Sequence, residues 1–570
     1  MIMISQTKKS AFLYLTEFKI ATIGLLIIIG VGVCINSFSP IIYGKIVDLM
    51  IAKQHSKFLK ILILYAVMLL LMAILSNMEN YFIQLLSSNA YRKNQQKLFE
   101  EVLRKKVSDL EKIELGKLMS NLSGDLSVII QYSIELVTTL IFILFNLFVP
   151  LVFIFCINIK MALISIIFAP VSIIIFTYFK NRKQKIHKEL IDFEDKQGSF
   201  TVNCILNINA IKAYKIESEM SRKYNLNTNS LKKIEKKSNR LNTQVEFLNE
   251  LTSSIFQIIL LVVAGILIIK GEITIGIFIS FGIYAAKLFS SIDMIQKLQL
   301  KEQPVVVSLE RLQHLNNILT ENYERSSKNK VIERIENIDI NNLSFSYEAK
   351  EEVLSSLTIL INQKGFYSLV GKNGSGKSTL FKILMNFYED YQGSICLNGI
   401  NYFELNTCDI RKHITYVQKV PFIIEDSLYE NISLYKGISD CDILKICERV
   451  GLCPLVKELP NGLSNKVSEK TLSSGQLQKL SFARALAHPA DVYLFDEITS
   501  DLDGFSEGQL VDIMKTLGKD KIVISISHRI NAVSSSDKIF FLKSGKIVAE
   551  GSFTQLQNSC EEFSKMFSML

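Results

Sequence analysis

A nine-residue segment in the second half of the chain combines glycines, a lysine and hydroxyl side chains at a spacing suited to phosphate. Its residues are, in order, Gly371, Lys372, Asn373, Gly374, Ser375, Gly376, Lys377, Ser378 and Thr379. They follow a short apolar stretch and fit the pattern G-x-x-x-x-G-K-[ST], in which backbone N–H groups converge on phosphate oxygens. The helix expected after the loop adds its positive N-terminal end. We therefore expect Lys377 to reach the outer phosphates of a nucleoside triphosphate and Ser378 to bind Mg²⁺.

Two acidic residues follow a second apolar stretch, Val492–Phe495. Asp496 is placed to hold Mg²⁺, as an acidic residue does in phosphate-loop NTPases. Glu497, the next residue, can polarise an attacking water as general base. Together with the glycine-rich loop, this pair predicts nucleoside triphosphate hydrolysis.

Short apolar strands alternate with helical stretches over residues 337–570, which is typical of an α/β domain. This domain would position both motifs, since each follows a predicted strand. The polar residues 321–336 before it are predicted to be a linker. The nine cysteines of the chain are scattered without a CxxC pair, so we predict neither a disulfide scaffold nor a zinc site.

Residues 1–320 differ sharply from this domain in composition. The whole chain of 570 residues is 49% hydrophobic and only 21% charged, which excludes a wholly soluble enzyme. About 20 apolar residues suffice to cross a bilayer as a helix. Six segments qualify, and we predict a membrane α-helical bundle of six transmembrane helices: roughly 20–44, 59–83, 134–156, 161–179, 251–270 and 273–295.

The net charge of +9 lies mainly in two stretches between these segments, within residues 84–133 and 180–248. Under the positive-inside rule such stretches are cytoplasmic, which places both termini in the cytoplasm of a multi-pass protein of the cytoplasmic (inner) membrane. Both stretches keep helical spacing of apolar residues, with bends expected near Glu111–Gly124 and Ile205–Glu217. No nucleic-acid module accompanies the charge, so we expect lipid and not nucleic acid as a partner.

Lys287 is the most unusual polar residue in the apolar segments, about fourteen residues into the sixth. A charge at such depth is costly and usually faces a wet cavity. Reaching the interface or pairing within the bundle remain the alternatives for this lysine. Glu135, Asn146 and Gln257 are the other polar residues that we note in these segments.

A third motif between the first two carries a resemblance to a known family. The sequence Leu472-Ser473-Ser474-Gly475-Gln476 is similar to the LSGGQ signature of ATP-binding cassette (ABC) transporters. By this resemblance, Ser473, Gly475 and Gln476 face the ATP bound to a partner chain. The remaining family motifs imply that Tyr347 stacks on adenine, that Gln418 links Mg²⁺ and the attacking water to the membrane part, that Ser500–Asp503 forms the D-loop, and that His528 contacts the γ-phosphate.

The resemblance extends to the architecture, which is similar to an exporter-type half-transporter. One chain has one phosphate loop and one signature, so a second half-transporter is implied, with two ATP molecules between the cassettes. A homodimer is favoured over a heterodimer. Two departures from the family pattern are either tolerated or indicate pairing with a different subunit that has a stronger signature: Ser474 replaces a glycine, and Val467–Thr471 is a short, glycine-free version of the x-loop. Because Glu497 and His528 are both present, we favour an active ATPase.

The cargo is the least constrained part of the prediction. Three stretches resemble exporters of mature antimicrobial peptides, including lasso-peptide microcins: Ser39–Ile42, Phe366–Leu369 and Ser527–Asn531. We also expect no leader-cleaving protease domain before the first span. The hypothesis is therefore ATP-driven peptide export with self-immunity. A multidrug or lipid exporter of lipophilic substrates is the nearest alternative, and a non-transporting ATP-gated regulator is the alternative of another class.

Overall fold

The computed structural model describes residues 18–113, 115–157, 159–321, 330–347 and 351–568. The chain divides into two compact units. The first unit contains Met1–Arg104 and Lys112–Leu319. The second contains Thr320–Leu570 together with the short segment Lys105–Glu111. The middle of the predicted linker, residues 322–329, lies outside the described residues.

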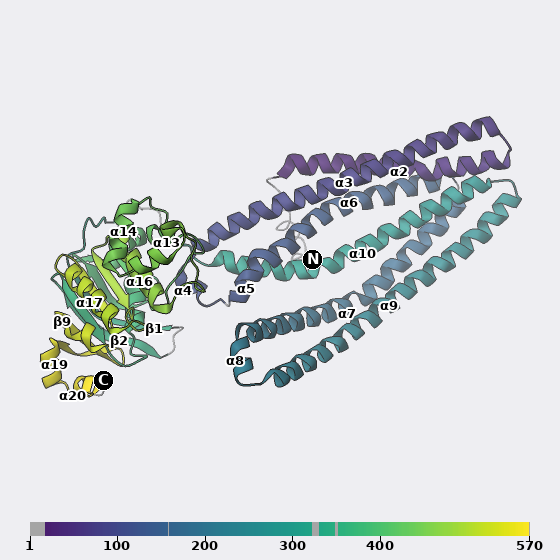
Figure 1. Cartoon of the computed structure of the whole chain (residues 1–570). Helices are drawn as coiled ribbons and strands as arrows, with labels where there is room; N and C mark the ends of the chain where they lie inside the picture. The colour runs from purple at the N-terminus through teal and green to yellow at the C-terminus, as the bar shows by residue number, and fades with distance from the viewer. Residues whose placement is uncertain (1–17, 114, 158, 322–329, 348–350, 569–570) are drawn as a thin grey trace. The chain divides into compact units, whose positions relative to one another are not determined.

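Long helices make up the first unit (Figure 1). Each of the six predicted apolar segments lies in one of them: α2 (Lys19–Ile51), α3 (His55–Leu103), α6 (Leu126–Ile157), α7 (Ile159–Leu206), α9 (Glu217–Ile269) and α10 (Ile275–Asn317). Among the described residues, four helices are long and apolar enough to cross a membrane, and Ile275–Ser291 of α10 is a shorter apolar helix. The predicted membrane α-helical bundle is thus confirmed.

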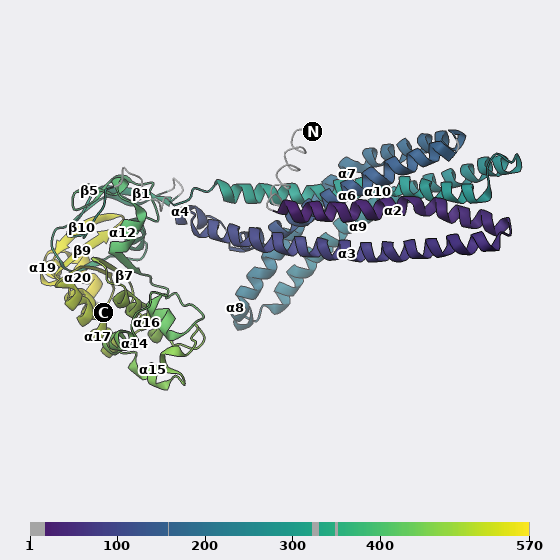
Figure 2. The ribbon, with the colours of Figure 1, turned by 90° about the horizontal axis from the view of Figure 1, so that it is seen from above.

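The two long loops fold as helical arms with bends. The second arm turns through α8 (Ile208–Ala213), inside the range predicted for its bend. Helices α7 and α9, which flank α8, pack side by side in both views (Figure 2). The first arm turns through α4 (Val107–Leu110) and the turn directly after it, so the bend begins just before the predicted range and extends into it. Only afterwards do α5 (Leu115–Ser120) and the π-helical turn Asn121–Asp125 lead into α6.

Helices α2 and α10 approach each other closely through two glycines. A Cβ atom on Gly276 would lie 2.1 Å from the carbonyl oxygen of Gly44, so a larger residue cannot fit there. Asp48 fixes the same end of the pair, because its carboxylate accepts from Thr274 Oγ1 at 2.7 Å and from the Gly276 N–H at 2.8 Å. Small residues at helix contacts of this kind allow close backbone packing in membranes.

Two β-sheets form the centre of the second unit. The larger has the strand order β10-β9-β3-β8-β7-β6. Its strands are β3 (Gly365–Val370), β6 (Ile414–Val417), β7 (Val492–Asp496), β8 (Ile522–Ile526), β9 (Lys538–Lys543) and β10 (Lys546–Gly551). All neighbouring pairs are parallel except β9 and β10. The second sheet is antiparallel where paired: β1 (Ile338–Ser346), β2 (Glu352–Ile361), β4 (Gln392–Leu397) and β5 (Ile400–Asn401).

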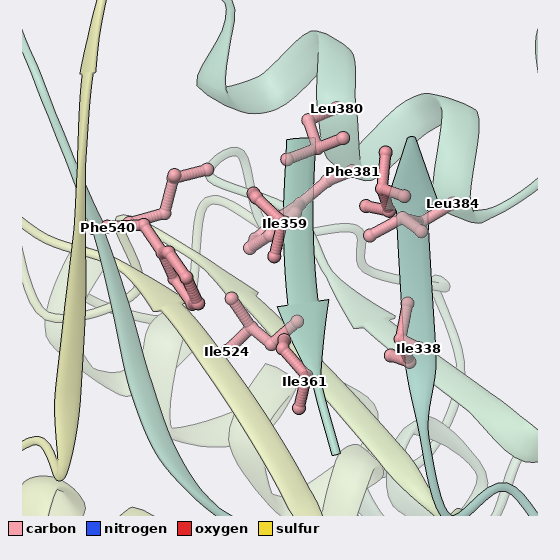
Figure 3. A pocket seen from close by; sticks show the side chains of 10 residues that line it. Ile338, Ile359, Ile361, Leu380, Phe381, Leu384, Ile524 and Phe540 are labelled. Atoms are coloured by element: carbon pink, nitrogen blue, oxygen red, sulfur yellow. The ribbon is translucent and has the colours of Figure 1, made fainter. Parts of the chain in front are cut away.

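The space between the two sheets is filled by apolar side chains. A small pocket there is lined only by such residues, including Ile338, Ile359, Phe381 and Phe540 (Figure 3). Four helices matter for the site: α11 (Lys377–Leu384), α13 (Leu428–Ser433), α16 (Ser474–Ala487) and α17 (Gly504–Gly518). The remaining ones are α12 (Thr407–His413), α14 (Asp440–Arg449), α15 (Cys453–Glu458), α18 (Ile530–Ser534), α19 (Phe553–Ser559) and α20 (Glu561–Ser568). This is the α/β domain predicted from the sequence.

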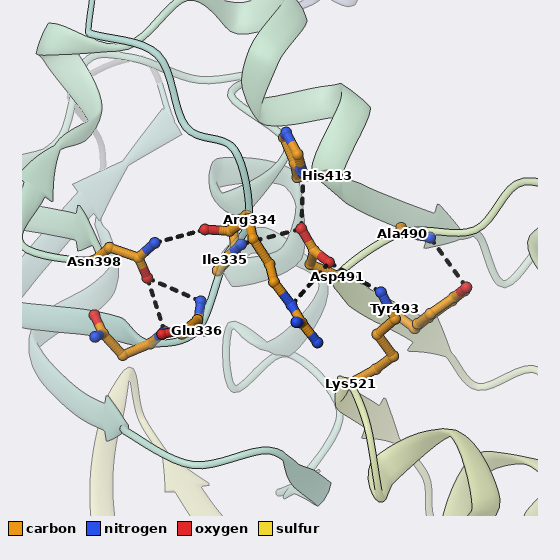
Figure 4. Close-up of polar contacts among 10 residues, drawn as sticks. Arg334, Ile335, Glu336, Asn398, His413, Ala490, Asp491, Tyr493 and Lys521 are labelled. Atoms are coloured by element: carbon orange, nitrogen blue, oxygen red, sulfur yellow. Dashed lines mark hydrogen bonds and ion pairs between the residues drawn. The ribbon is translucent and has the colours of Figure 1, made fainter.

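Asp491, directly before β7, joins both sheets through a polar cluster (Figure 4). Its carboxylate accepts from the Ile335 N–H at 3.1 Å, from His413 Nδ1 at 2.8 Å and from Lys521 Nζ at 3.0 Å. Burial alone would raise the pKa of Asp491, but these hydrogen bonds outweigh burial and lower it. The chain entering β1 is thereby tied to the start of β7.

Candidate nucleotide-binding site

The parallel register of the large sheet gathers the predicted motifs at one edge. Leu369 of β3 and Asp496 of β7 both pair with Ile526 at the end of β8. The glycine-rich loop follows β3 and His528 follows β8, so both start beside Asp496. Ligands of open α/β sheets bind at the carboxyl ends of the strands.

The glycine-rich loop has the backbone shape that its sequence demands. Gly374 and Gly376 have φ angles of +79° and +103°. A Cβ atom on Gly376 would lie 2.6 Å from Leu354 Cδ2 and 2.8 Å from the Val353 carbonyl oxygen, so only glycine fits. Helix α11 begins directly afterwards, at Lys377. Its N-terminal backbone N–H groups have no intrahelical partner and can bind an anion.

Lys377 is buried at the base of this loop. Its ammonium group donates to the carbonyl oxygens of Gly371 at 2.7 Å and Lys372 at 3.0 Å. Burial lowers the pKa of Lys377, while the carboxylates of Glu497 and Asp496 oppose the shift. The structure therefore brings the lysine and both acidic residues into one electrostatic site.

Asp496 is a buried carboxylate whose two oxygens differ in their hydrogen bonding. Its side chain is only 3% exposed, and Tyr416 Oη donates to Oδ2 at 3.1 Å. Burial raises the pKa of Asp496, with hydrogen bonds from Ser378 and Tyr416 acting in the opposite direction. The other oxygen, Oδ1, is buried and has no hydrogen-bond partner among the described residues. A carboxylate oxygen of this kind beside the Ser378 hydroxyl fits the oxygen ligands that Mg²⁺ prefers.

Glu497 lies between two basic side chains. Its backbone has a φ of +51°, which turns the chain sharply away from β7. Lys419 Nζ is 2.5 Å from Glu497 Oε2, and His528 Nε2 is 3.6 Å from Oε1. Burial, followed by the nearby Lys377 charge, holds the pKa of His528 below its ordinary value. His528 is consequently neutral at neutral pH and can either donate or accept a hydrogen bond.

Tyr347 is connected to the loop from the smaller sheet. Its hydroxyl lies 3.1 Å from Thr379 Oγ1, and its ring makes an edge contact with Tyr388 at 5.3 Å between centroids. Tyr388 in turn donates to Glu111, in the segment Lys105–Glu111 of this same unit. Lys382 of α11 also binds Glu111, at 3.0 Å. The aromatic residue predicted to meet adenine thus belongs to a chain of contacts that ends beside α4.

The signature residues form the exposed N-terminus of α16. Ser473 is the N-cap, and its hydroxyl accepts from the Gln476 N–H while Gln476 Oε1 accepts from the Ser473 N–H at 2.9 Å. This capping box leaves Ser474 and Gly475 in the first helical turn. Within the described residues, no hydrogen bond or ion pair joins Ser473, Gly475 or Gln476 to the glycine-rich loop. The structure of one chain therefore does not bring the signature to its own phosphate loop.

Gln418 is exposed directly after β6. The register pairs Val417 with Phe495, which sets Gln418 at the level of Asp496. Of the remaining loop residues, Asn373 and Ser378 are exposed. Ser375 is buried, and its hydroxyl has no hydrogen-bond partner in the part of the chain that the structure describes.

Three site residues escaped the sequence reasoning: Lys419, Tyr416 and Tyr388. Each contacts a predicted residue only because of the fold, through Glu497, Asp496 and Tyr347 respectively. Lys419 and Tyr416 flank the predicted Gln418 by one and two positions, which is the signal that would have found them. Nothing in the sequence pointed to Tyr388.

Two family models match the chain in succession. Residues 22–292 match the ABC transporter transmembrane region, and residues 354–500 match the ABC transporter model that contains the site described above. The chain belongs to the ABC transporters. With this domain and its hydrolytic motifs, the ABC transporter is an ATP-hydrolysing enzyme, as the sequence predicted.

Individual relatives agree with this assignment. A putative export ATP-binding/permease protein of Rickettsia conorii is 28% identical, with 91% of each chain covered. The pediocin PA-1 transport/processing ATP-binding protein PedD of Pediococcus acidilactici is 29% identical over 70% of this chain and 56% of its own length. The structure of a bacterial Atm1-family ABC exporter with ATP bound has a TM-score of 0.84, 19% identity, and coverage of 97% of this chain and 99% of that one. The fold is therefore that of an ABC exporter.

Proposed function

We propose that this ABC exporter moves a peptide out of the cytoplasm, driven by ATP binding and hydrolysis between two copies of the chain. The observation that carries the ATP-driven part is the gathering of Lys377, Asp496 and Glu497 at the carboxyl edge of one sheet. Here Lys377 binds the outer phosphates and Tyr347 stacks on adenine. Glu497 polarises the attacking water, with His528 at the γ-phosphate.

Mg²⁺ is proposed as the metal of this site. Asp496, Ser378 and Gln418 would hold it, because Asp496 Oδ1 is buried without a partner and the other two side chains lie at the same sheet edge. When bound, the metal would neutralise charge that develops on the phosphates. The protein's own part is to fix these oxygens through the Tyr416 hydrogen bond to Asp496.

A dimer is proposed because one cassette lacks a complete site. Among the residues described, the exposed N-terminus of α16 makes no hydrogen bond or ion pair with the glycine-rich loop of its own chain. A second copy would present Ser473, Gly475 and Gln476 to the ATP on the first, with the positive end of α16 toward the γ-phosphate. A homodimer is the simplest arrangement, since each chain carries Glu497 and His528.

The proposed location is the cytoplasmic membrane with both termini inside. The cationic stretches of the long arms support this orientation through the positive-inside rule. The segment Lys105–Glu111 would then lie with the cassette on the cytoplasmic side. Its ion pairs with the cassette, Lys106 to Glu389 at 2.6 Å and Glu111 to Lys382, would transmit closure to the arms.

Peptide cargo is supported by the likeness to PedD, whose printed name describes pediocin transport. A test measures vanadate-sensitive ATPase in proteoliposomes and ATP-dependent uptake of a hydrophobic peptide into inside-out vesicles. We expect Glu497→Gln and Lys377→Ala each to abolish both, while Lys372→Ala, an exposed residue of the same loop, keeps both. Full activity in either of the first two variants would refute the assigned site. Uptake of lipophilic dyes but of no peptide would favour a multidrug exporter instead, and ATPase without any uptake would favour a regulator.

A further inference from the structure

A positive charge without a negative partner lies inside the helical bundle, at Lys287 of α10. Its ammonium group donates to the backbone carbonyl oxygen of Asn36 at 2.7 Å and to Asn36 Oδ1 at 3.2 Å. Both acceptors are neutral. Within the described part of the chain, no carboxylate forms an ion pair with Lys287. The charge is therefore solvated by dipoles but not neutralised.

Pro40 explains why the carbonyl of Asn36 can accept this bond. In a helix the carbonyl of residue 36 would receive the N–H of residue 40, and proline has none. Two neighbouring side chains of α10 reinforce the contact. Tyr284 donates to the Ser37 carbonyl at 2.5 Å and Ser280 donates to the Pro40 carbonyl at 2.7 Å. The ammonium group is thus held against α2 at a fixed position and not extended toward the interface.

The position along α10 puts this charge deep in the membrane. Lys287 follows Ile275, the first residue of α10, by twelve positions, which at 1.5 Å per residue is about 18 Å. The hydrocarbon core is about 30 Å thick. The Lys287 side chain is only partly buried, and its neighbours Ala286 and Ser290 are exposed in one chain. An uncompensated ammonium group at this depth is costly, and such residues usually mark a substrate pathway.

We propose that Lys287 is a specificity-determining residue that binds an anionic group of the cargo, such as a peptide carboxylate. An ammonium group has three donors, and Asn36 supplies acceptors for two of them. An anion would take the third and neutralise the charge. This proposal rests on the proposed export function and deepens it. An acidic lipid headgroup offers the same chemistry, so the test includes one.

Lys287 also has a structural role, because it bonds to the Asn36 carbonyl. The substitution Pro40→Ala separates this role from the proposed binding of cargo. This substitution restores a backbone N–H that can bind the Asn36 carbonyl, so the variant no longer needs the lysine to satisfy that oxygen. Lys287→Gln alone removes the charge and, because the side chain is one atom shorter, weakens the bond to α2. The double variant Pro40→Ala with Lys287→Gln removes the charge while the carbonyl keeps a donor. Lys270→Gln, in the exposed turn after α9, is the matched control.

The experiment measures ATP-dependent uptake into inside-out vesicles of dansyl-Leu-Phe-Ile-Phe with a free carboxylate and of its C-terminal amide. We expect the wild type, Pro40→Ala and Lys270→Gln to have a KM about tenfold lower for the acid, because a hydrogen bond to a charged group is stronger than one to a neutral group. Lys287→Gln and the double variant should bring the ratio near one, mainly through KM for the acid. A parallel measurement compares fluorescent phosphatidic acid with the matching diacylglycerol. A preference for the acidic compound in this measurement alone would assign the anion to lipid.

Three outcomes would overturn the proposal. The first is that the wild type takes up both peptides and shows no preference for the acidic compound in either the peptide or the lipid measurement. This result would leave the export function itself intact. The second is a preference that survives in the double variant. The third is the absence of ATP-dependent uptake of every probe, which contradicts the export function together with this proposal.

Discussion

The two ends of β7 carry buried aspartates that should respond oppositely to the same substitution. Asp496, at the end of the strand, has a raised pKa and one buried oxygen that accepts no hydrogen bond from any described residue. Asp491, just before the strand, accepts three hydrogen bonds from Ile335, His413 and Lys521 and has a lowered pKa. We predict that Asp496→Asn stabilises the nucleotide-free protein and that Asp491→Asn destabilises it.

The size of the expected change in stability follows from the hydrogen bonds of each aspartate. In Asp496→Asn the new side chain can still accept from Tyr416 through its oxygen and donate to the Ser378 hydroxyl through its amide, so no bond is lost. Relief of an unsatisfied buried carboxylate is worth about 1–2 kcal/mol. For a unit of this size that corresponds to a rise of about 2–8 °C in Tm. Asp491→Asn leaves the Lys521 charge without its carboxylate and should lower Tm by a similar amount.

The pH dependence of folding stability tests the direction of both effects independently. Because the pKa of Asp496 is raised in the folded protein, its contribution to stability is complete below the ordinary carboxyl pKa of about 3.9 and is lost as pH rises through the folded value. The gain in Asp496→Asn should therefore be larger at pH 8 than at pH 5. For Asp491 the pKa is lowered, so its contribution is present above about pH 4 and is lost only in stronger acid.

The assay is thermal unfolding of the purified full-length chain in detergent, with and without Mg·ATP, followed by ATPase measurements. Asp496→Asn should lose at least about a hundredfold in ATPase activity and most of the Tm increase that Mg·ATP gives the wild type. Asp491→Asn should keep the activity at temperatures where it is folded. A nucleotide-free Tm for Asp496→Asn at or below that of the wild type would refute the reasoning about its orphan oxygen.

The other predictions concern the loop and the aromatic contact. Gly376→Ala should lower Tm and abolish ATP binding, because its Cβ would meet Leu354 and the φ of +103° is strained for alanine; normal binding measured with a fluorescent ATP analogue would contradict this. Tyr347→Phe loses only the hydroxyl contact to Thr379 and should keep KM for ATP within about threefold, whereas Tyr347→Ala loses the ring face and should raise it about tenfold or more; equal values for the two would show that the ring does not stack on adenine. His528→Ala should reduce the ATPase rate of the full chain by at least about a hundredfold with little change in ATP binding, since its proposed contact forms with the γ-phosphate alone; an unchanged rate would exclude that role.

Contiguous motifs were the part of this protein that the sequence predicted best. The loop Gly371–Thr379 and the pair Asp496-Glu497 each follow an apolar run, and parallel strands necessarily bring their carboxyl ends to one edge. The apolar segments of the first unit were equally clear, because a helix in lipid must be apolar over about 20 residues. Both features depend on local spacing, which a sequence displays directly.

The sequence did not reveal the contacts between residues that are far apart along the chain. The hydrogen bond from Tyr416 to Asp496 joins residues 80 positions apart, and the one from Tyr388 to Glu111 joins residues 277 apart. The first bend was predicted near Glu111–Gly124, and it begins a few residues earlier, with α4 at Val107–Leu110. No pattern marked Asn36 as the partner of Lys287, because that contact arises from the missing N–H of Pro40 in a different helix.

The capping box at the start of α16 also bears on the serine that departs from the family signature. The backbone N–H groups of Ser473 and Gln476 are already bonded, to Gln476 Oε1 and Ser473 Oγ respectively, so the main-chain hydrogens that the first turn leaves open to an oxyanion are those of Ser474 and Gly475. Serine carries that hydrogen as glycine does. Serine in place of glycine at position 474 therefore removes no backbone donor. Its side chain instead reduces the space at the start of α16 for an approaching ligand.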